Sequence, residues 1–212
     1  YKNGKWTTAV KNTGINKTTA EVNGLNPGAE YKLRVMCFKD GTEVIYGVPA
    51  EITVSTLPSV VAGFKTKSKS YNSITLQWNK NTSATGYELQ KWNGKKWVAL
   101  IKITKNSTTT YTVKSLKAST TYKYRIRAYK TIGKATQYSG YKELSVNTNP
   151  SNMSGFKAKS KSYNSITLQW NKNTSATGYE LQKWNGKKWV ALTKITKNST
   201  TTYTVKSLKA SA

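Results

Sequence analysis

Residues 63–97 read GFKTKSKSYNSITLQWNKNTSATGYELQKWNGKKW, and almost the same stretch recurs 92 residues later. The recurrence pairs residues 63–119 with residues 155–211 over 57 positions, and two of them differ: Thr66 against Ala158 and Ile101 against Thr193. A fixed period of this length is typical of a repeat array in which each period is one structural unit. The 212 residues are therefore expected to form domains of about 90 residues rather than one large domain.

Apolar and polar residues alternate within each period, as they do in β-strands that have one buried face. Ile74, Leu76 and Trp78 face one way, so we expect all three side chains in the core. About seven such runs fit into one period, separated by polar turns such as Asn93-Gly94. This pattern predicts an all-β fold, a tandem array of seven-stranded antiparallel β-sandwiches.

The same period contains three further features at fixed places in the predicted strands. Trp78 closes the second strand, Gly86-Tyr87 opens the third, and Leu116 stands six residues before Tyr122 of the sixth strand. Together these features resemble the fibronectin type III domain family, in which that Tyr pins the loop between the fifth and sixth strands. The resemblance implies tandem β-sandwich domains, similar to those of Gram-positive bacterial surface or secreted proteins.

The resemblance also divides the chain into three segments. Leu25 and Tyr31 match Leu116 and Tyr122, so the first segment resembles the C-terminal part of such a domain. The expected divisions are 1–57 for that part, 58–149 for a complete domain and 150–212 for the N-terminal part of a near-identical repeat. The short proline-bearing junctions between them predict a stiff rod. We expect the two end segments to be completed either by sequence beyond this window or by pairing of the tail of one copy with the head of the next. Neighbouring repeats of the same array are therefore expected partners.

The net charge of +27 is unevenly distributed over these segments, as +2, +15 and +10. Of the 35 cations 32 are Lys, which acts as a hydrated point charge, whereas Arg suits bidentate recognition of phosphates and bases. A surface this basic resists self-association and attracts polyanions with salt-dependent strength. Two interpretations remain open: a solubilising coat, or attraction to an anionic cell-wall polymer. Specific nucleic-acid recognition is not expected.

The sequence offers little that could perform catalysis. It contains no His, and Glu88 and Glu143 are the only acids of the complete period. A glycosidase needs two facing carboxylates, and metal sites need clustered Cys, His or acidic ligands. We therefore expect no enzyme activity, no cofactor, no metal site and, without a long apolar run, no transmembrane segment. Cys37 continues the alternation of Leu33 and Val35, which predicts a thiol buried on the inward face of a strand.

Aromatic residues at the turns are the candidate binding site. Trp92 and Trp97 bracket a four-residue turn that would place them opposite one another, and Tyr1 and Trp6 do the same in the first segment. Such pairs could simply stabilise the hairpin by cross-strand stacking. Alternatively, they could form a flat platform that stacks on sugar rings or holds an anionic glycan. The candidate ligand-binding residues are Trp92, Trp97, Lys91, Lys95, Lys96, Trp184 and Trp189.

Two functions from different classes are consistent with these patterns. The first is a non-catalytic spacer or stalk in an extracellular bacterial surface protein. The alternative is a multivalent adhesion module, in which each copy binds a wall polyanion or glycan weakly and the number of copies supplies avidity.

Overall fold

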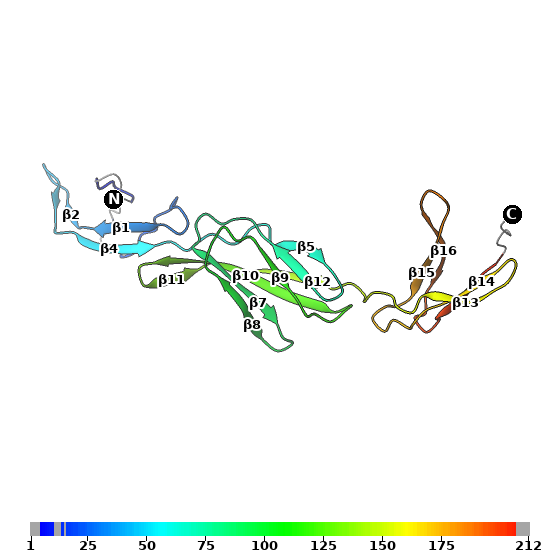
Figure 1. Cartoon of the computed structure of the whole chain (residues 1–212). Coiled ribbons are helices and arrows are strands. Elements are labelled where there is room, and N and C mark those ends of the chain that lie inside the picture. The colour runs from blue at the N-terminus through cyan, green and yellow to red at the C-terminus, as the bar shows by residue number, and fades with distance from the viewer. Residues whose placement is uncertain (1–4, 11–13, 15, 207–212) are drawn as a thin grey trace. The chain divides into compact units, whose positions relative to one another are not determined.

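The structure is a computed structural model of the chain, and it describes residues 5–10, 14 and 16–206. The elements assigned within these residues are all β-strands (Figure 1). Across this part of the chain, no helix is long and apolar enough to cross a membrane. Tyr1, the expected partner of Trp6, lies outside the described residues.

The described part of the first segment forms two antiparallel strand pairs. β1 pairs with β4, placing Leu33 opposite Ile52, and β2 pairs with β3. The strands are β1 (Glu30–Val35), β2 (Phe38–Lys39), β3 (Ile45–Tyr46) and β4 (Ala50–Ser55).

The prediction that Cys37 is buried in a strand is wrong. β1 ends at Val35, and Cys37 is exposed in the connection that precedes β2. Val35 is 71% exposed and Ile52 on β4 is 61% exposed. Among the described residues, this side of the β1–β4 pair is not covered, so an inward position in the alternation does not produce burial here.

The middle segment forms two sheets. β5, β6 and β9 make a three-stranded sheet, while β11, β10, β7 and β8 make the second sheet, in which β12 also pairs with β10. The strands are β5 (Lys65–Lys69), β6 (Ile74–Gln77), β7 (Gly86–Trp92), β8 (Trp97–Ile103), β9 (Thr110–Val113), β10 (Thr121–Ile132), β11 (Ala135–Tyr138) and β12 (Lys142–Asn147).

The last strand predicted from the sequence, Leu144–Val146, lies within β12, and β11 is an additional strand that was not predicted. Both strands pair with β10, and an interruption at residues 139–141 separates them. Ser139 lies in the interruption and is buried. Its Oγ accepts a hydrogen bond from the Ala128 amide at 2.9 Å, and its own amide donates to the Ala128 carbonyl at 2.9 Å. The β10 backbone therefore keeps its hydrogen-bond partners across the break.

The core lies where the alternation predicts it. Ile74 and Leu76 on β6 are fully buried, as are Tyr87 and Leu89 on β7. Trp78 is 4% exposed and packs edge-to-face on Tyr87, with the ring centroids 5.5 Å apart. Each sheet thus has one apolar face that is buried, the pattern of a β-sandwich.

The tyrosine that the resemblance singles out performs its expected role in two segments. The Tyr122 hydroxyl accepts a hydrogen bond from the Lys117 amide at 2.8 Å, and Tyr31 does the same for Asn26 at 2.6 Å. Leu116 is buried beneath this loop. These loops are therefore held by side chains as well as by strand pairing.

The third segment repeats the first half of the middle one. β13, β14 and β17 form a three-stranded sheet, and β15 pairs with β16. Trp170, the counterpart of Trp78 in the repeat, is 6% exposed and so belongs to the core as Trp78 does. The strands are β13 (Lys157–Lys161), β14 (Ile166–Gln169), β15 (Tyr179–Trp184), β16 (Trp189–Ile195) and β17 (Thr202–Val205).

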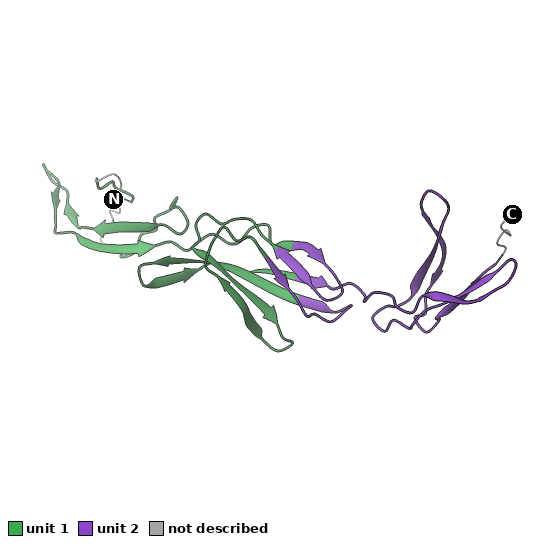
Figure 2. Cartoon of the chain, viewed as in Figure 1, with its two compact units in different colours: residues 1–65, 77–110, 123–144 green, residues 66–76, 111–122, 145–212 purple. Residues whose placement is uncertain are grey.

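The chain divides into two compact units (Figure 2). The first comprises residues 1–65, 77–110 and 123–144, and the second comprises residues 66–76, 111–122 and 145–212. This division does not follow the 92-residue period. The domain boundaries expected at residues 57/58 and 149/150 stay a prediction.

Candidate functional site

The two Trp residues of the middle turn lie opposite one another, as predicted. Trp92 ends β7, Trp97 begins β8, and the two are direct partners in the strand register. The turn closes with a hydrogen bond from the Asn93 amide to the Lys96 carbonyl at 3.1 Å. Gly94 has φ +98°, a conformation that favours Gly over residues with a Cβ.

The predicted lysines surround this turn. Asn93 Oδ1 accepts hydrogen bonds from the Lys95 and Lys96 amides at 3.0 and 2.9 Å. The Lys95 and Lys96 side chains are exposed, and Lys91 on β7 is half-buried. The hairpin thus brings the five predicted residues of the middle segment together, while ligand binding by them stays a prediction.

The two rings do not form the flat surface that a sugar platform would need. Their centroids are 5.5 Å apart and their planes are inclined by 65°, so one ring presents its edge to the other. Edge-to-face pairs of this kind contribute about 0.5–1.5 kcal/mol beyond the area they bury. The geometry therefore favours stacking that holds the hairpin together.

Arginine side chains of β10 extend this pair across the sheet. The Arg125 guanidinium lies 4.6 Å from the Trp97 ring centroid and 3.9 Å from that of Tyr141. Its Nε also donates a hydrogen bond to Gln90 Oε1 at 2.8 Å. Arg125 is thus stacked between two aromatic rings and fixed in direction by a neighbour on β7.

Arg127 repeats the arrangement two residues further along β10. Its guanidinium lies 3.7 Å from the Tyr138 ring centroid and 4.8 Å from that of Tyr141. It also pairs with Glu88, donating to Oε2 from Nη2 at 2.7 Å and from Nε at 2.9 Å. We call the whole series the aromatic–arginine ladder, which consists of Trp92, Trp97, Arg125, Tyr141, Arg127 and Tyr138.

The alternation of β10 explains why both arginines lie on the same face. Tyr124, Ile126 and Ala128 are fully buried, so the residues between them point away from the core. Tyr138 is the last residue of β11, and Tyr141 lies in the interruption before β12. Side chains from four separate stretches of sequence thus meet on one sheet face.

Glu88 lies beside the ladder and interacts electrostatically with two of its members, Arg127 and Tyr138. The pKa of the Tyr138 hydroxyl is raised above its ordinary value, first by burial and then by the negative charge of Glu88. Glu88 itself is half-buried and holds Arg127. These contacts are satisfied within the protein, which is typical of a stabilising network.

A related contact occurs in the first segment. The Arg34 guanidinium lies 4.2 Å from the centroid of Trp6. Trp6 precedes Trp97 by 91 residues, and Arg34 precedes Arg125 by the same interval. This shared interval is a signal from which the two arginines could have been identified in the sequence, although neither was predicted as part of a site.

The third segment has the Trp pair but no arginine. Trp184 and Trp189 stack edge-to-face with their centroids 5.6 Å apart. They are 49% and 64% exposed, whereas Trp92 and Trp97 are half-buried. With the 92-residue offset the position that corresponds to Arg125 is residue 217, so residues 150–212 do not include it.

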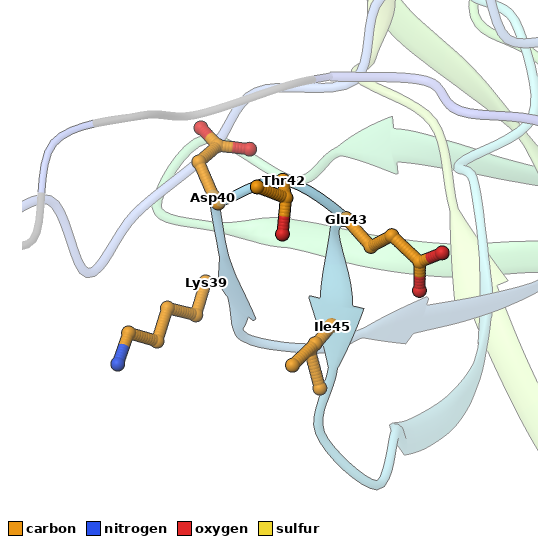
Figure 3. Close-up of a pocket in the computed structure, with 6 residues that line it drawn as sticks. Lys39, Asp40, Thr42, Glu43 and Ile45 are labelled. Atoms are coloured by element: carbon orange, nitrogen blue, oxygen red, sulfur yellow. The ribbon is translucent and has the colours of Figure 1, made fainter.

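One depression in the surface of the first segment does not resemble a ligand pocket. Its volume is about 440 Å³, and the β2–β3 hairpin lines it from Lys39 to Ile45. Figure 3 shows the Lys39, Asp40 and Glu43 side chains pointing away from one another rather than toward a common centre. Within the described parts of the chain, no three His, Cys, Asp or Glu residues are grouped as metal ligands would be.

Comparison with known proteins gives one family match and relatives with several different names, among them the receptor-type tyrosine-protein phosphatase eta of Gallus gallus, which is 28% identical over 84% of this chain and 12% of that protein. A family model described as fibronectin type III domain matches residues 59–141. Chitinase A1 of Niallia circulans is 25% identical over 192 residues, and an alpha-amylase of the same organism is 34% identical over 98 residues.

These matches cover unequal shares of each protein. The chitinase match spans 85% of this chain and 25% of the chitinase, and the amylase match spans 45% and 7%. Among solved structures, a two-domain fibronectin type III segment of chicken tenascin is 17% identical, with a TM-score of 0.44 over 71% of this chain and 85% of that one.

Proposed function

Because residues 59–141 are a fibronectin type III domain and residues 155–211 repeat most of it, we propose that this chain is a non-catalytic spacer segment of a secreted or surface-attached bacterial protein. The near-identity of the two copies carries this proposal. An added copy lengthens a spacer, whereas an active site gains nothing from a duplicate beside it.

The guanidinium groups of the aromatic–arginine ladder already have interaction partners within the protein, which supports a structural role. The guanidinium of Arg125 is stacked on two rings, and that of Arg127 is stacked and ion-paired. The chitinase is named as an enzyme, and the part of it that resembles this chain is 25% of its length. We infer that repeats of this kind accompany catalytic domains that lie elsewhere in such proteins, and that they act outside the cell.

The spacer proposal is tested by changing the number of repeats. A chain with one further copy of residues 58–149 inserted after residue 149 is compared with the original by small-angle X-ray scattering. We expect the maximum dimension to increase by about 40 Å, since the longest strand of the middle segment, β10, has 12 residues and a strand rises about 3.3 Å per residue. An unchanged maximum dimension would contradict the spacer role.

Adhesion to a wall polyanion is a second candidate, and the distribution of acids favours it. Glu88 and Glu143 are the only acids of residues 58–149, against 17 cations, and Glu88 is already paired with Arg127. Most of the positive charge is therefore available for long-range attraction.

Retention on immobilised teichoic acid distinguishes the two candidates. A spacer is expected to elute at an ionic strength of about 0.15 M, where charges further apart than about 8 Å are screened. A multivalent binder is expected to remain bound there and to elute at a salt concentration that increases with the number of repeats.

A further inference from the structure

The linkers around Pro58 and Pro150 have the same set of hydrogen bonds, although they belong to different parts of the chain. Ser59 and Ser151 directly follow these prolines. The Asn81 side chain contacts Ser59 twice, since Nδ2 donates to the Ser59 carbonyl at 2.7 Å and Oδ1 accepts from its hydroxyl at 3.2 Å.

Ser83 also forms hydrogen bonds with the first linker. Its Oγ accepts a hydrogen bond from the Ser59 amide at 2.9 Å. The same Oγ donates to Asn81 Oδ1 at 2.7 Å, so the Asn81 and Ser83 side chains are also hydrogen-bonded to each other. Both backbone polar groups of Ser59 and its hydroxyl are therefore bound by two residues of the loop between β6 and β7.

The second linker shows nearly the same distances. Asn173 Nδ2 donates to the Ser151 carbonyl at 2.7 Å, and its Oδ1 accepts from the Ser151 hydroxyl at 3.0 Å. The Ser151 amide donates to Ser175 Oγ at 2.8 Å. The arrangement is thus a property of the repeat.

Asn81, which binds Ser59, is itself hydrogen-bonded to a residue of the core. Asn81 is 7% exposed, and its backbone amide donates a hydrogen bond to the Tyr87 hydroxyl at 2.8 Å. The ring of Tyr87 is fully buried, and its hydroxyl donates to the Asn106 carbonyl at 2.9 Å. Motion of Ser59 relative to the middle segment would therefore require breaking several hydrogen bonds to Asn81 and Ser83, and Asn81 is itself held by a buried hydrogen bond.

The residue before each proline is held from the other side. The Leu57 carbonyl accepts a hydrogen bond from the Gly28 amide at 2.9 Å, and the Asn149 carbonyl accepts one from the Ser119 amide at 3.0 Å. Only Pro58 separates Leu57 from Ser59, and proline has a fixed φ and no amide hydrogen. Few backbone torsions thus remain free to act as a hinge.

We propose that Asn81 and Ser83, and equally Asn173 and Ser175, form a linker lock that suppresses bending at the proline junctions. The lock fixes the serine after the proline to the following domain, while the residue before the proline belongs to the preceding one. A stiff junction would result from side chains of the β6–β7 and β14–β15 loops and not from the linker sequence alone. This inference concerns the linkers and holds whether the array is a spacer or a binder.

The test measures the distance between two spin labels across the first junction. Cys37 is the only cysteine and is exposed, so it takes one label, and Ser107→Cys on an exposed loop of the middle segment takes the other. We expect the double variant Asn81→Ala, Ser83→Ala to broaden the distance distribution. The matched control, Asn173→Ala with Ser175→Ala, removes the same groups at the other junction and should leave this distribution unchanged.

Two results would overturn the lock. An unchanged distribution in the Asn81 and Ser83 variant would show that these residues do not restrict the junction. Equal broadening by both double variants would show a general loss of structure instead of a local effect. Circular dichroism melting curves of both variants check that the sandwich remains folded. None of these outcomes bears on length or teichoic acid retention, so the spacer proposal is tested separately.

Discussion

The backbone carbonyl oxygen of Ser83 closes the space beside Gly28, so that a Cβ at Gly28 would lie 2.2 Å from it. Gly28 also has φ +61°, a backbone conformation that residues with a Cβ adopt at a cost. Ser119, its counterpart in the middle segment, has φ 47° and donates its hydroxyl to the Ser175 carbonyl. The same position is thus occupied by a hydrogen in one junction and by a hydroxymethyl group in the other.

Replacing Gly28 by Ala should therefore reduce the free energy of unfolding by more than the cost of the left-handed backbone conformation alone. The left-handed conformation costs a residue with a Cβ about 1–2 kcal/mol, and the contact with Ser83 adds to this because a carbonyl cannot move aside alone. Urea unfolding followed by circular dichroism measures the loss. Gly24→Ala is the matched control, since Gly24 has φ +73° and a Cβ added there would meet no atom within 4 Å. Equal losses in the two variants would contradict the close approach.

Trp78→Ala should remove about 3–5 kcal/mol of stability, because it leaves a large cavity in the core. Trp78→Phe should cost less, since the indole Nε1 is buried without a hydrogen-bond partner in the described structure and its loss leaves no new polar group unsatisfied. Urea titration monitored by circular dichroism compares the three proteins. A Phe variant as unstable as the Ala variant would show that the fit of the indole matters more than its burial.

The Trp pairs at the two turns should differ in their contribution to stability. Trp92→Thr with Trp97→Thr removes an edge-to-face pair and the stacking of Arg125, which is worth about 0.5–1 kcal/mol at an exposed site. The matched variant, Trp184→Thr with Trp189→Thr, removes a similar pair from a segment without Arg. We expect the first double variant to unfold at a lower urea concentration than the second.

A binding role for the turn aromatics predicts a different outcome for the same two double variants. If the turn aromatics form a glycan or wall-polymer site, both variants should lose retention on teichoic acid or polysaccharide while the fold survives. Unchanged retention together with lower stability would support a structural role for the pair.

Tyr138 should make the protein less stable in alkali. Its pKa is raised in the folded state, so the folded protein holds this proton more tightly than the unfolded chain does. The resulting stabilisation is complete below the unfolded pKa of about 10 and disappears as pH rises through the higher folded pKa. Tyr138→Phe should therefore show a shallower loss of stability above about pH 10, measured by urea unfolding at several pH values. An identical pH profile in the variant would assign the alkaline loss to other groups.

The alternation of residues along each strand predicted the core of the repeats correctly. Ile74, Leu76 and Trp78 are buried because strand side chains point to opposite faces in turn, and a buried face selects apolar residues. The Tyr122 loop was also predictable, since its partner Lys117 lies five residues away. Contacts this local are encoded in short spacings that can be read along the chain.

Cys37 shows where the same alternation fails. Cys37 is an apolar residue that continues the alternation of Leu33 and Val35, but its burial also requires a second layer of structure over that face of the strand pair. The described residues of the first segment provide a strand pair without such a layer, and the thiol is exposed. Periodicity gives the direction of a side chain and does not reveal what lies opposite it.

By itself, the sequence determined the repeat, the β-sandwich class, the buried tryptophans and the position of the turns, because each depends on local spacing or self-comparison. Only the tertiary structure decided that Arg125 and Arg127 stack between aromatic rings and that Asn81 holds Ser59. These contacts join residues from different strands and loops, and the ion pair of Arg127 with Glu88 spans 39 positions of the chain. Which distant side chains meet depends on strand order and register, and those are set when the whole apolar face is buried at once.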